Sequence, residues 1–118
     1  MRGRTTDPTP ADAVTRTLWA LADPVRRTVL QRLAHGPATT GQLAALFPIS
    51  RAAVSQHLRV LRTAGLVRST SQSRQSPYEL APGPLVETEA WLRGLVDVWS
   101  AGPTARSAVR SARTGGAP

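Results

Sequence analysis

The sequence predicts a mostly α-helical fold with a small β-hairpin (α+β), arranged as a winged helix-turn-helix and expected to be dimeric. Apolar residues recur at helical spacing along most of residues 11–100. A tight turn, Pro48-Ile49-Ser50, separates a short helical segment from a longer one. The next segment, Leu66–Leu80, is rich in Ser and Thr and ends in alternating polar and apolar residues, which is typical of a hairpin.

The two ends of the chain have little to bury. Residues 1–10 are rich in Gly, Pro and Thr, and residues 101–118 hold one large apolar residue, Val109. Neither segment can offset the entropy of ordering its backbone. We therefore expect a disordered arm over 1–10, one folded unit over 11–100 and a disordered basic tail over 101–118. A unit this small would gain stability from a dimer interface.

The first two helices are indicated by periodicity and by capping residues. A first helix is expected from Ala11 to about Ala22, with three apolar residues on one face: Val14, Leu18 and Leu21. Asp23 is a favoured N-cap and Pro24 a favoured first residue, so a second helix follows to about His35. Its inward residues are expected to be Val25, Val29, Leu30 and Leu33.

The remaining elements follow from caps and helix breakers. Thr39 and Gln42 fit a capping box, which predicts a short helix to about Phe47 that buries Leu43 and Leu46. Ser50 caps a fourth helix over 51–64, which Gly65 ends. After the hairpin, Pro82-Gly83-Pro84 introduces a final helix from Leu85 to about Ser100.

The positive charge is concentrated in the middle of the chain. The formal net charge is +8, and all 15 basic residues are arginine. Between Pro24 and Tyr78 no acid opposes the arginines, which are Arg26, Arg27, Arg32, Arg51, Arg59, Arg62, Arg68 and Arg74. Such a block indicates a polyanionic partner, either nucleic acid or an anionic membrane. A membrane-binding helix would expose an apolar face beside its arginines, whereas here that face is needed for the core.

Helix 51–64 has two chemically different faces. Val54, Leu58 and Leu61 lie together and are expected in the core. The opposite face has no acid, and its side chains can pair with base edges in a major groove or pack on a thymine methyl. The candidate DNA-binding residues on this face are Arg51, Ala52, Ser55, Gln56, Arg59 and Arg62. The alternative is a solvated helix face with ordinary arginines.

The wing, residues 67–80, adds Arg68 and Arg74 to the candidates. We expect Arg74, near the tip, to contact a minor groove; the alternative is a polar turn with one exposed arginine. Arg26 is expected to pair with an acid and brace the fold, whereas Arg27 could reach a phosphate. His57 lies on the buried side and is expected to be hydrogen-bonded at the domain edge, with a phosphate contact as the alternative. About five to seven arginines per subunit are expected to reach a duplex.

Several classes of protein are excluded by residue content. The absence of cysteine excludes disulfides and thiolate metal sites, and the absence of lysine excludes a Walker-type phosphate loop. We find no acid–base pair and no nucleophile elbow, so we expect no enzyme, no catalytic residue and no cofactor. The first residues do not form a signal peptide, and no apolar run is long enough to cross a membrane. The expected location is cytoplasmic, associated with the nucleoid.

Two segments carry a family resemblance. Leu21–Arg27, followed by Val29–Leu33, resembles the second-helix signature of the ArsR family of bacterial winged-helix regulators. Ile49–Val67 closely resembles that family's recognition helix and the start of its wing. The likeness covers roughly residues 15–99 and implies a homodimeric transcriptional regulator, usually a repressor, on a palindromic operator.

The chain departs from the founding members of that family, which sense metals through cysteines on the third helix or through His and acidic residues on the last. Here Thr40–Leu46 has no thiol and the last helix has no histidine. We therefore expect no metal site at those positions. The stretch Pro77–Leu92 resembles the metal-independent branch of the family. The effector, a small molecule or a protein, is not identified by the sequence.

The final helix has a wide apolar face. Its apolar residues cover an arc of about 160°, more than the ~100° needed to face one core. We expect it to pair with the same helix and the first helix of a second subunit. The candidate dimerisation residues are Val14, Leu18, Trp19, Trp91, Leu95, Val98 and Trp99. The alternative is a helix deeply buried in the monomer.

The function expected from the sequence is regulation of transcription by a homodimer bound to double-stranded DNA. The helix 51–64 would enter the major groove, with two such helices about 34 Å apart on two half-sites. The competing hypothesis is a winged-helix protein-interaction module that does not bind specific DNA. The acid-free block argues against this alternative, because a protein partner would not require it.

Overall fold

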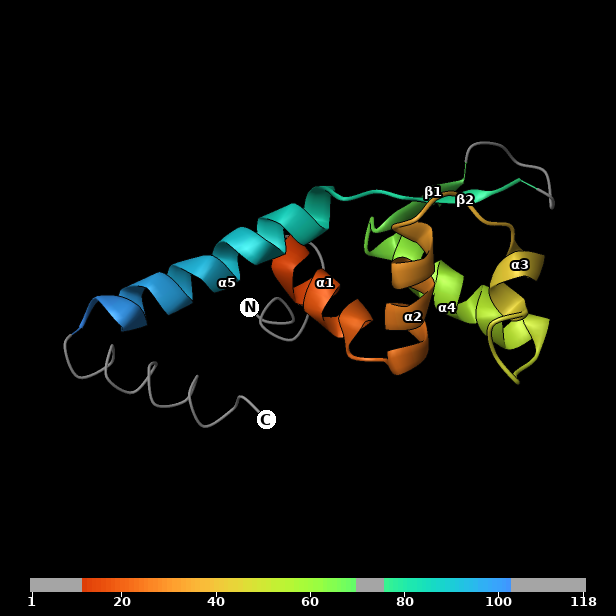
Figure 1. Cartoon of the computed structure of the whole chain (residues 1–118), viewed down its shortest axis with the longest axis horizontal. Coiled ribbons are helices and arrows are strands. Elements are labelled where there is room, and N and C mark those ends of the chain that lie inside the picture. The colour runs from red at the N-terminus through yellow and green to blue at the C-terminus, as the bar shows by residue number, and fades with distance from the viewer. Residues whose placement is uncertain (1–11, 70–75, 103–118) are drawn as a thin grey trace, which may run out of the picture. The chain divides into compact units, whose positions relative to one another are not determined.

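The structure is a computed structural model that describes residues 12–69 and 76–102. Figure 1 shows its elements, which in chain order are α1 (Ala13–Leu21), α2 (Pro24–Leu33), α3 (Thr40–Ala44), α4 (Arg51–Thr63), β1 (Val67–Ser69), β2 (Tyr78–Leu80) and α5 (Gly83–Ala101). This order confirms the predicted mostly helical fold with a two-stranded hairpin. The chain divides into two compact units between Thr88 and Glu89, within α5.

The predicted domain limits stay largely untested. The expected arm over 1–10 and most of the expected tail over 101–118 lie outside the described residues. Ala101, which the sequence places in the tail, is the last residue of α5. The expectation of one folded unit over 11–100 stays a prediction.

Side-chain caps begin each of the first four helices. Asp12 accepts from the Thr15 backbone N–H, and Asp23 accepts from that of Arg26. At α3 the predicted capping box is present: Thr39 accepts from the Gln42 N–H, and the Gln42 side chain accepts from the Thr39 N–H. Ser50 accepts from the N–H of Ala53 at 3.0 Å. Each cap satisfies a backbone donor that the helix itself leaves free.

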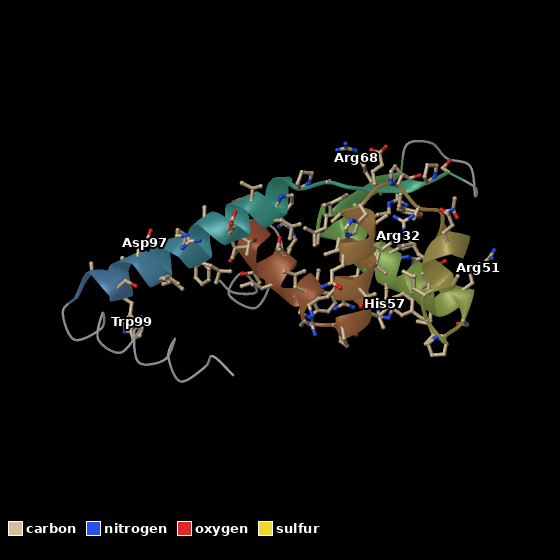
Figure 2. All side chains as sticks on the ribbon, viewed as in Figure 1. Arg32, Arg51, His57, Arg68, Asp97 and Trp99 are labelled. Atoms are coloured by element: carbon tan, nitrogen blue, oxygen red, sulfur yellow. The ribbon has the colours of Figure 1, made fainter. Side chains whose placement is uncertain are left out.

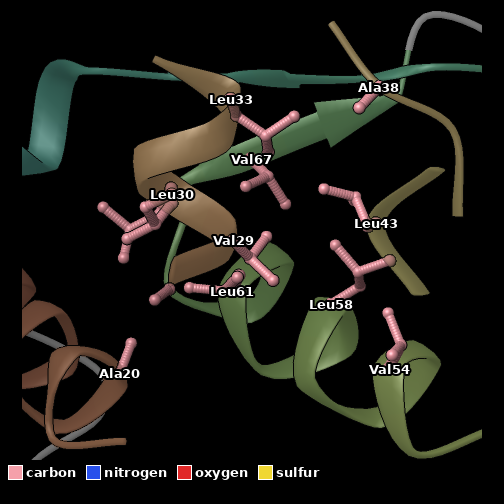
Figure 3. Packing of buried hydrophobic residues seen from close by; sticks show 12 residues of the cluster. Ala20, Val29, Leu30, Leu33, Ala38, Leu43, Val54, Leu58, Leu61 and Val67 are labelled. Carbon is pink, nitrogen blue, oxygen red and sulfur yellow. The ribbon is translucent and has the colours of Figure 1, made fainter. Parts of the chain in front are cut away.

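The core of the first unit lies between α2 and α4. Figure 3 shows residues of α2 facing residues of α4, with α3 and β1 closing the cluster. The fully buried members include Val29, Leu43, Val54, Leu61 and Leu66, each 0% exposed. Burying one such side chain stabilises the fold by about 1.5–3 kcal/mol. The predicted inward residues of α2 and α4 are confirmed.

One predicted core residue is wrong. Leu46 is 45% exposed, although the sequence predicts it to be buried beside Leu43. The cause is the length of α3, which ends at Ala44 rather than near Phe47. The chain then turns tightly, and Phe47 packs partly against the core instead.

The hairpin is joined to the helices through its second strand. β1 and β2 pair antiparallel, with Val67 opposite Leu80 and Ser69 opposite Tyr78. Tyr78 also forms a bridge with Ala38, whose N–H and C=O both bond to it. The link before α3 is thereby tied to the hairpin, a contact that the sequence pattern does not indicate. Gly65, at φ +77°, makes the turn from α4 into β1.

The two ends of α5 differ in burial. In the first unit, Leu85 packs against the core and Thr88 is buried. In the second unit, every residue of α5 from Glu89 to Trp99 is exposed. The helix begins at Gly83, two residues earlier than predicted, and runs to Ala101.

We expect the cap at Asp23 to contribute measurably to stability. Asp23→Ala should lower the free energy of unfolding by about 1 kcal/mol, because the Arg26 N–H loses its acceptor. Asp23→Asn, whose side-chain oxygen can still accept, should lose much less. Urea unfolding at neutral pH distinguishes the two variants, and equal losses would mean that the cap is not the cause.

The pH dependence gives a second measurement on the same residue. Burial raises the pKa of Asp23, but the Arg26 N–H and the charges of His57 and Arg26 outweigh burial and hold it below 3.8. A lowered pKa means that the charge stabilises the fold fully above pH 3.8 and that this contribution is lost as pH falls through the lowered pKa. The stability difference between wild type and Asp23→Asn should therefore shrink at acid pH.

Candidate nucleic-acid interface

One face of helix α4 is buried in the core, and the opposite face is exposed to solvent. Val54, Leu58 and Leu61 are at most 1% exposed and point into the core. The opposite face carries six exposed side chains, which we name the recognition face: Arg51, Ala52, Ser55, Gln56, Arg59 and Arg62. All six residues predicted on this helix therefore lie on one continuous surface.

A polar hollow of about 440 Å³ adjoins the recognition face. It lies between α4 and the second strand of the hairpin, and its lining residues are Ser55, Arg59, Arg62, Thr63 and Tyr78. The hollow combines two guanidinium groups with hydroxyl groups, a set of donors suited to phosphate oxygens.

Tyr78 is a residue of this surface that the sequence pattern does not identify. In the sequence it is only a strand residue. Strand alternation indicates which residues share its face of the hairpin, but not that this face meets α4, because that depends on how the hairpin packs.

Arg51 lies against the first turn of α3. A Cβ added to Gly41 would stand 3.2 Å from the Arg51 Nη2, so the absent side chain leaves space for this guanidinium. Figure 2 shows Arg51 beside α3, at the start of α4. The structure therefore places Arg51 at one end of the recognition face, whereas Arg59 and Arg62 lie toward the hairpin.

Arg26 is a structural residue, as predicted, but its partners are carbonyls rather than an acid. Its Nε donates to the Ala20 carbonyl at 2.7 Å and its Nη2 to the Trp19 carbonyl at 3.2 Å. The guanidinium lies 5.0 Å from the centre of the Trp19 ring. Arg26 thus caps the C-terminal end of α1 and fixes that end to the start of α2.

His57 connects α4 to the same network. Its Nδ1 lies 3.4 Å from the Arg26 Nη1 and 3.8 Å from the Asp23 Oδ2. The side chain is half-buried beside α2 (Figure 2). The expected hydrogen-bonded histidine at the domain edge is confirmed by these contacts.

Three further arginines of the acid-free block have partners inside the chain. Arg27 donates to the Leu21 carbonyl at 2.6 Å, and Arg32 donates to the carbonyls of Gly36 and Pro37. Arg68 lies 3.5 Å from a carboxylate oxygen of Glu79. These contacts close helix ends and pair the strands across the hairpin.

Arg68 also points away from the recognition face. Neighbouring strand residues point to opposite faces, so Arg68 and its partner Glu79 lie on the side of the hairpin opposite to Tyr78. Figure 2 shows Arg68 on the side of the hairpin that faces away from the helices. Arg74, the other predicted wing contact, lies outside the described residues.

The remaining described arginines of the block are all on α4. In the described ranges 12–69 and 76–102, no ion pair or hydrogen bond engages the guanidinium groups of Arg51, Arg59 and Arg62. Among the described arginines of the block, those without a partner inside the chain are therefore concentrated on one helix. Four of the eight arginines of the block have partners inside the chain, and the expectation that five to seven of them reach a duplex stays a prediction.

Comparison with known proteins assigns the chain to a family. The helix-turn-helix domain family matches residues 21–70. The HTH-type transcriptional regulator Rv2034 of Mycobacterium tuberculosis H37Rv is 46% identical over 81 residues, 64% of this chain and 76% of that protein. The transcriptional repressor SdpR of Bacillus subtilis is 30% identical over 78 residues, 66% of this chain and 87% of that protein. The solved structure of the ArsR family transcriptional regulator RHA00566 aligns with a TM-score of 0.71 at 33% identity, over 76% of this chain and 93% of that one.

The chain belongs to the ArsR family. It is a DNA-binding transcriptional regulator with a winged helix-turn-helix, as the resemblance implied. An ArsR-like transcriptional regulator from Rhodococcus sp. RHA1 aligns with a TM-score of 0.70 at 26% identity, over 85% of this chain and 92% of that one. In this regulator the helix-turn-helix is α3, the Pro48–Ser50 turn and α4.

The residues predicted for dimerisation of this ArsR-family regulator lie on the surface of the chain. In the first unit, Trp19 is 62% exposed and Leu18 40%, whereas Val14 is half-buried. In the second unit, Val98 is 78% exposed, and the other three are about half exposed: Trp91, Leu95 and Trp99. None of the helices in the described residues could span a membrane.

We expect the arginines to separate into structural and surface classes when substituted. Arg26→Leu should lower the free energy of unfolding by about 1–3 kcal/mol, because two helix-end carbonyls lose their donor. Arg62→Leu should change it by about 0.5 kcal/mol or less, because no contact within the fold is lost. Urea unfolding measures both, and a stable Arg26→Leu variant would contradict the bracing role.

Proposed function

We propose that the protein is a homodimeric repressor that reads a palindromic operator by placing the helix 51–64 in the major groove. The single observation that carries the proposal is the division of α4 into a buried apolar face and an acid-free recognition face. The buried face supports this role because it fixes α4 to α2 and so sets which side chains can meet DNA. Relatives such as SdpR are named repressors, which supports repression rather than activation of transcription.

Individual roles follow from side-chain chemistry. Gln56 can accept from and donate to adenine, Ser55 can bond to either partner of a base pair, and Ala52 can pack on a thymine methyl. Arg51 is proposed to read guanine or to bind the backbone beside it. Arg59 and Arg62, which line the polar hollow, are proposed to bind phosphates. Arg68 and Arg74 of the wing 67–80 stay predictions from the sequence.

The homodimer is supported by the exposed apolar side chains of α1 and α5. Several exposed apolar residues on one helix favour an interface, because water solvates them poorly. The proposed interface uses the predicted residues Val14, Leu18, Trp19, Trp91, Leu95, Val98 and Trp99. Two-fold symmetry would place the two α4 helices about 34 Å apart, on successive major grooves.

We also propose that the regulator belongs to the metal-independent branch of its family. The residue content supports this assignment: the chain has no cysteine, and α5 has no histidine. Within the described part of the chain, no three His, Asp or Glu side chains gather closely enough to hold a metal ion. Because its proposed partner is duplex DNA, its place of action is proposed to be the nucleoid in the cytoplasm.

We expect two substitutions on α4 to affect DNA binding in different ways. Gln56→Ala should reduce discrimination at one base pair by about 1–3 kcal/mol, because base-edge hydrogen bonds are lost. Arg62→Ala should weaken binding to all sequences and reduce the salt slope by about one per subunit, because one phosphate contact is lost. Selection of bound sites from random duplexes, followed by affinity measurements at several salt concentrations, tests both. A footprint that neither substitution changes would contradict this assignment, and an absence of site preference in the wild type would favour the protein-interaction module.

We expect a charge on the exposed face of α5 to dissociate the dimer. Val98→Asp should give a monomer in sedimentation analysis, because it buries an unpaired carboxylate in the proposed interface. Gln31→Asp, at an exposed position on α2, is the matched control and should stay dimeric. A Val98→Asp variant that remains a dimer would exclude this face as the interface.

A further inference from the structure

A second hollow, of about 410 Å³, lies beside the polar hollow on α4, and Arg59 and Thr63 line both. We name it the α1–α4 hollow. From α1 it is lined by Thr15, Arg16 and Trp19, and from α4 by Arg59, Val60, Thr63 and Ala64. Its volume lies within the range of about 300–1,000 Å³ that is typical of small-molecule sites.

The lining of this hollow is mostly apolar and partly preformed. Val60 and Ala64 provide aliphatic surface, and Trp19, which the proposed dimer interface also uses, is 62% exposed in the single chain. The Arg26 guanidinium, 5.0 Å from the centre of that ring and bonded to the Trp19 carbonyl, holds the tryptophan in place. A fixed indole beside aliphatic residues favours an aromatic or other flat apolar ligand.

The charged groups at the hollow define the rest of the ligand. Both charged residues that line it are arginines, Arg16 and Arg59. The charge of Arg16 acts on Asp12, whose pKa is lowered mainly by its hydrogen bonds to Thr15 and less by that charge. In the described part of the chain no carboxylate pairs with Arg59. We propose that the α1–α4 hollow binds a small apolar molecule with one anionic group, and that the anion pairs with Arg59.

Arg59 connects this hollow to the DNA-binding surface. Arg59 and Thr63 line both the α1–α4 hollow and the polar hollow, whereas Arg62 lines only the polar one. An anion bound to Arg59 therefore competes with a phosphate for the same guanidinium, and each ligand weakens the other. This regulatory part rests on the proposed function, because it requires that Arg59 bind DNA.

The probe that tests the hollow is anilinonaphthalene sulfonate, an apolar dye with one anionic group that fluoresces when it leaves water. Its uncharged analogue, phenylnaphthylamine, tests the need for the anion. The full-length protein without DNA should bind the sulfonate at one saturable site per chain, more tightly than the neutral dye. Equal affinity for the two dyes would overturn the assignment of an anion site.

Two arginine variants provide the matched comparison. Arg59→Gln should weaken sulfonate binding about tenfold and leave the neutral dye unchanged, because only the ion pair is lost. Arg62→Gln removes the same charge one turn of helix further on and should leave both dyes unchanged. Equal effects of the two variants on the sulfonate would mean general attraction to a basic surface and would overturn the proposal.

Filling the hollow tests its location. Val60→Phe should remove the saturable site, and Gln31→Phe, which adds the same ring at an exposed position on α2, should keep it. Thr15→Phe is the second filling variant. It removes the bond from the Thr15 hydroxyl to Asp12 but keeps the backbone N–H that donates to the Asp12 cap. Circular dichroism and thermal unfolding show that each variant is folded. A folded filling variant that keeps the saturable site would place the dye elsewhere, for example on the exposed face of α5.

The last measurements test whether the ligand weakens DNA binding and whether a second copy of the chain fills the hollow instead. The sulfonate should raise the dissociation constant for duplex DNA of the wild type and not that of Arg59→Gln. If the hollow is instead filled by a second copy of the chain, dye binding will appear only on dissociation to monomers, which sedimentation with and without dye would show.

Because dye binding is measured without DNA, a protein that binds DNA but not the dye contradicts only this inference. A protein that binds the dye but not DNA contradicts the proposed function.

Discussion

Burial of one apolar stripe on α4 is the constraint on which the rest of the structure depends. Val54, Leu58 and Leu61 recur at helical spacing and pack against α2, with Leu43 of α3 closing the cluster. Because these side chains must leave water, the rotation of α4 about its own axis is set. The exposed face is consequently the polar one, and its residues need no contacts of their own to be oriented.

The arginines divide into two groups according to what the fold leaves unsatisfied. Helix ends expose carbonyl groups, and an arginine nearby can donate to them with several N–H groups at once. Arg26, Arg27 and Arg32 do so at the ends of α1 and α2. The arginines of α4 lie along the exposed side of their helix, away from such carbonyls. A high net charge in the sequence is therefore an upper limit on the charge offered to a partner. Within residues 24–69, the arginines without a partner in the fold are all on α4.

Helix α4 also carries the connection between the two hollows. Its apolar stripe faces the core, its recognition face lies opposite, and Arg59 and Thr63 line both hollows. A rigid helix does not bend when a ligand binds in one hollow. The long side chain of Arg59, however, can move its guanidinium from one hollow to the other. Coupling between a ligand and DNA then requires the movement of one side chain rather than of an element, and the core stays unchanged.

The sequence by itself determined the helices, their caps and the two faces of α4, because these depend on local periodicity and on hydrogen bonds between residues three apart. It predicted the recognition face for the same reason, whereas the family followed from the resemblance of two segments to ArsR-family regulators. Only the tertiary structure decided the exposure of Leu46, the bridge between Ala38 and Tyr78, and the carbonyl partners of Arg26. Each of these depends on groups that are distant in sequence or on where a short helix ends. An arginine that closes a helix and one that faces solvent are identical in a sequence, and packing alone separates them.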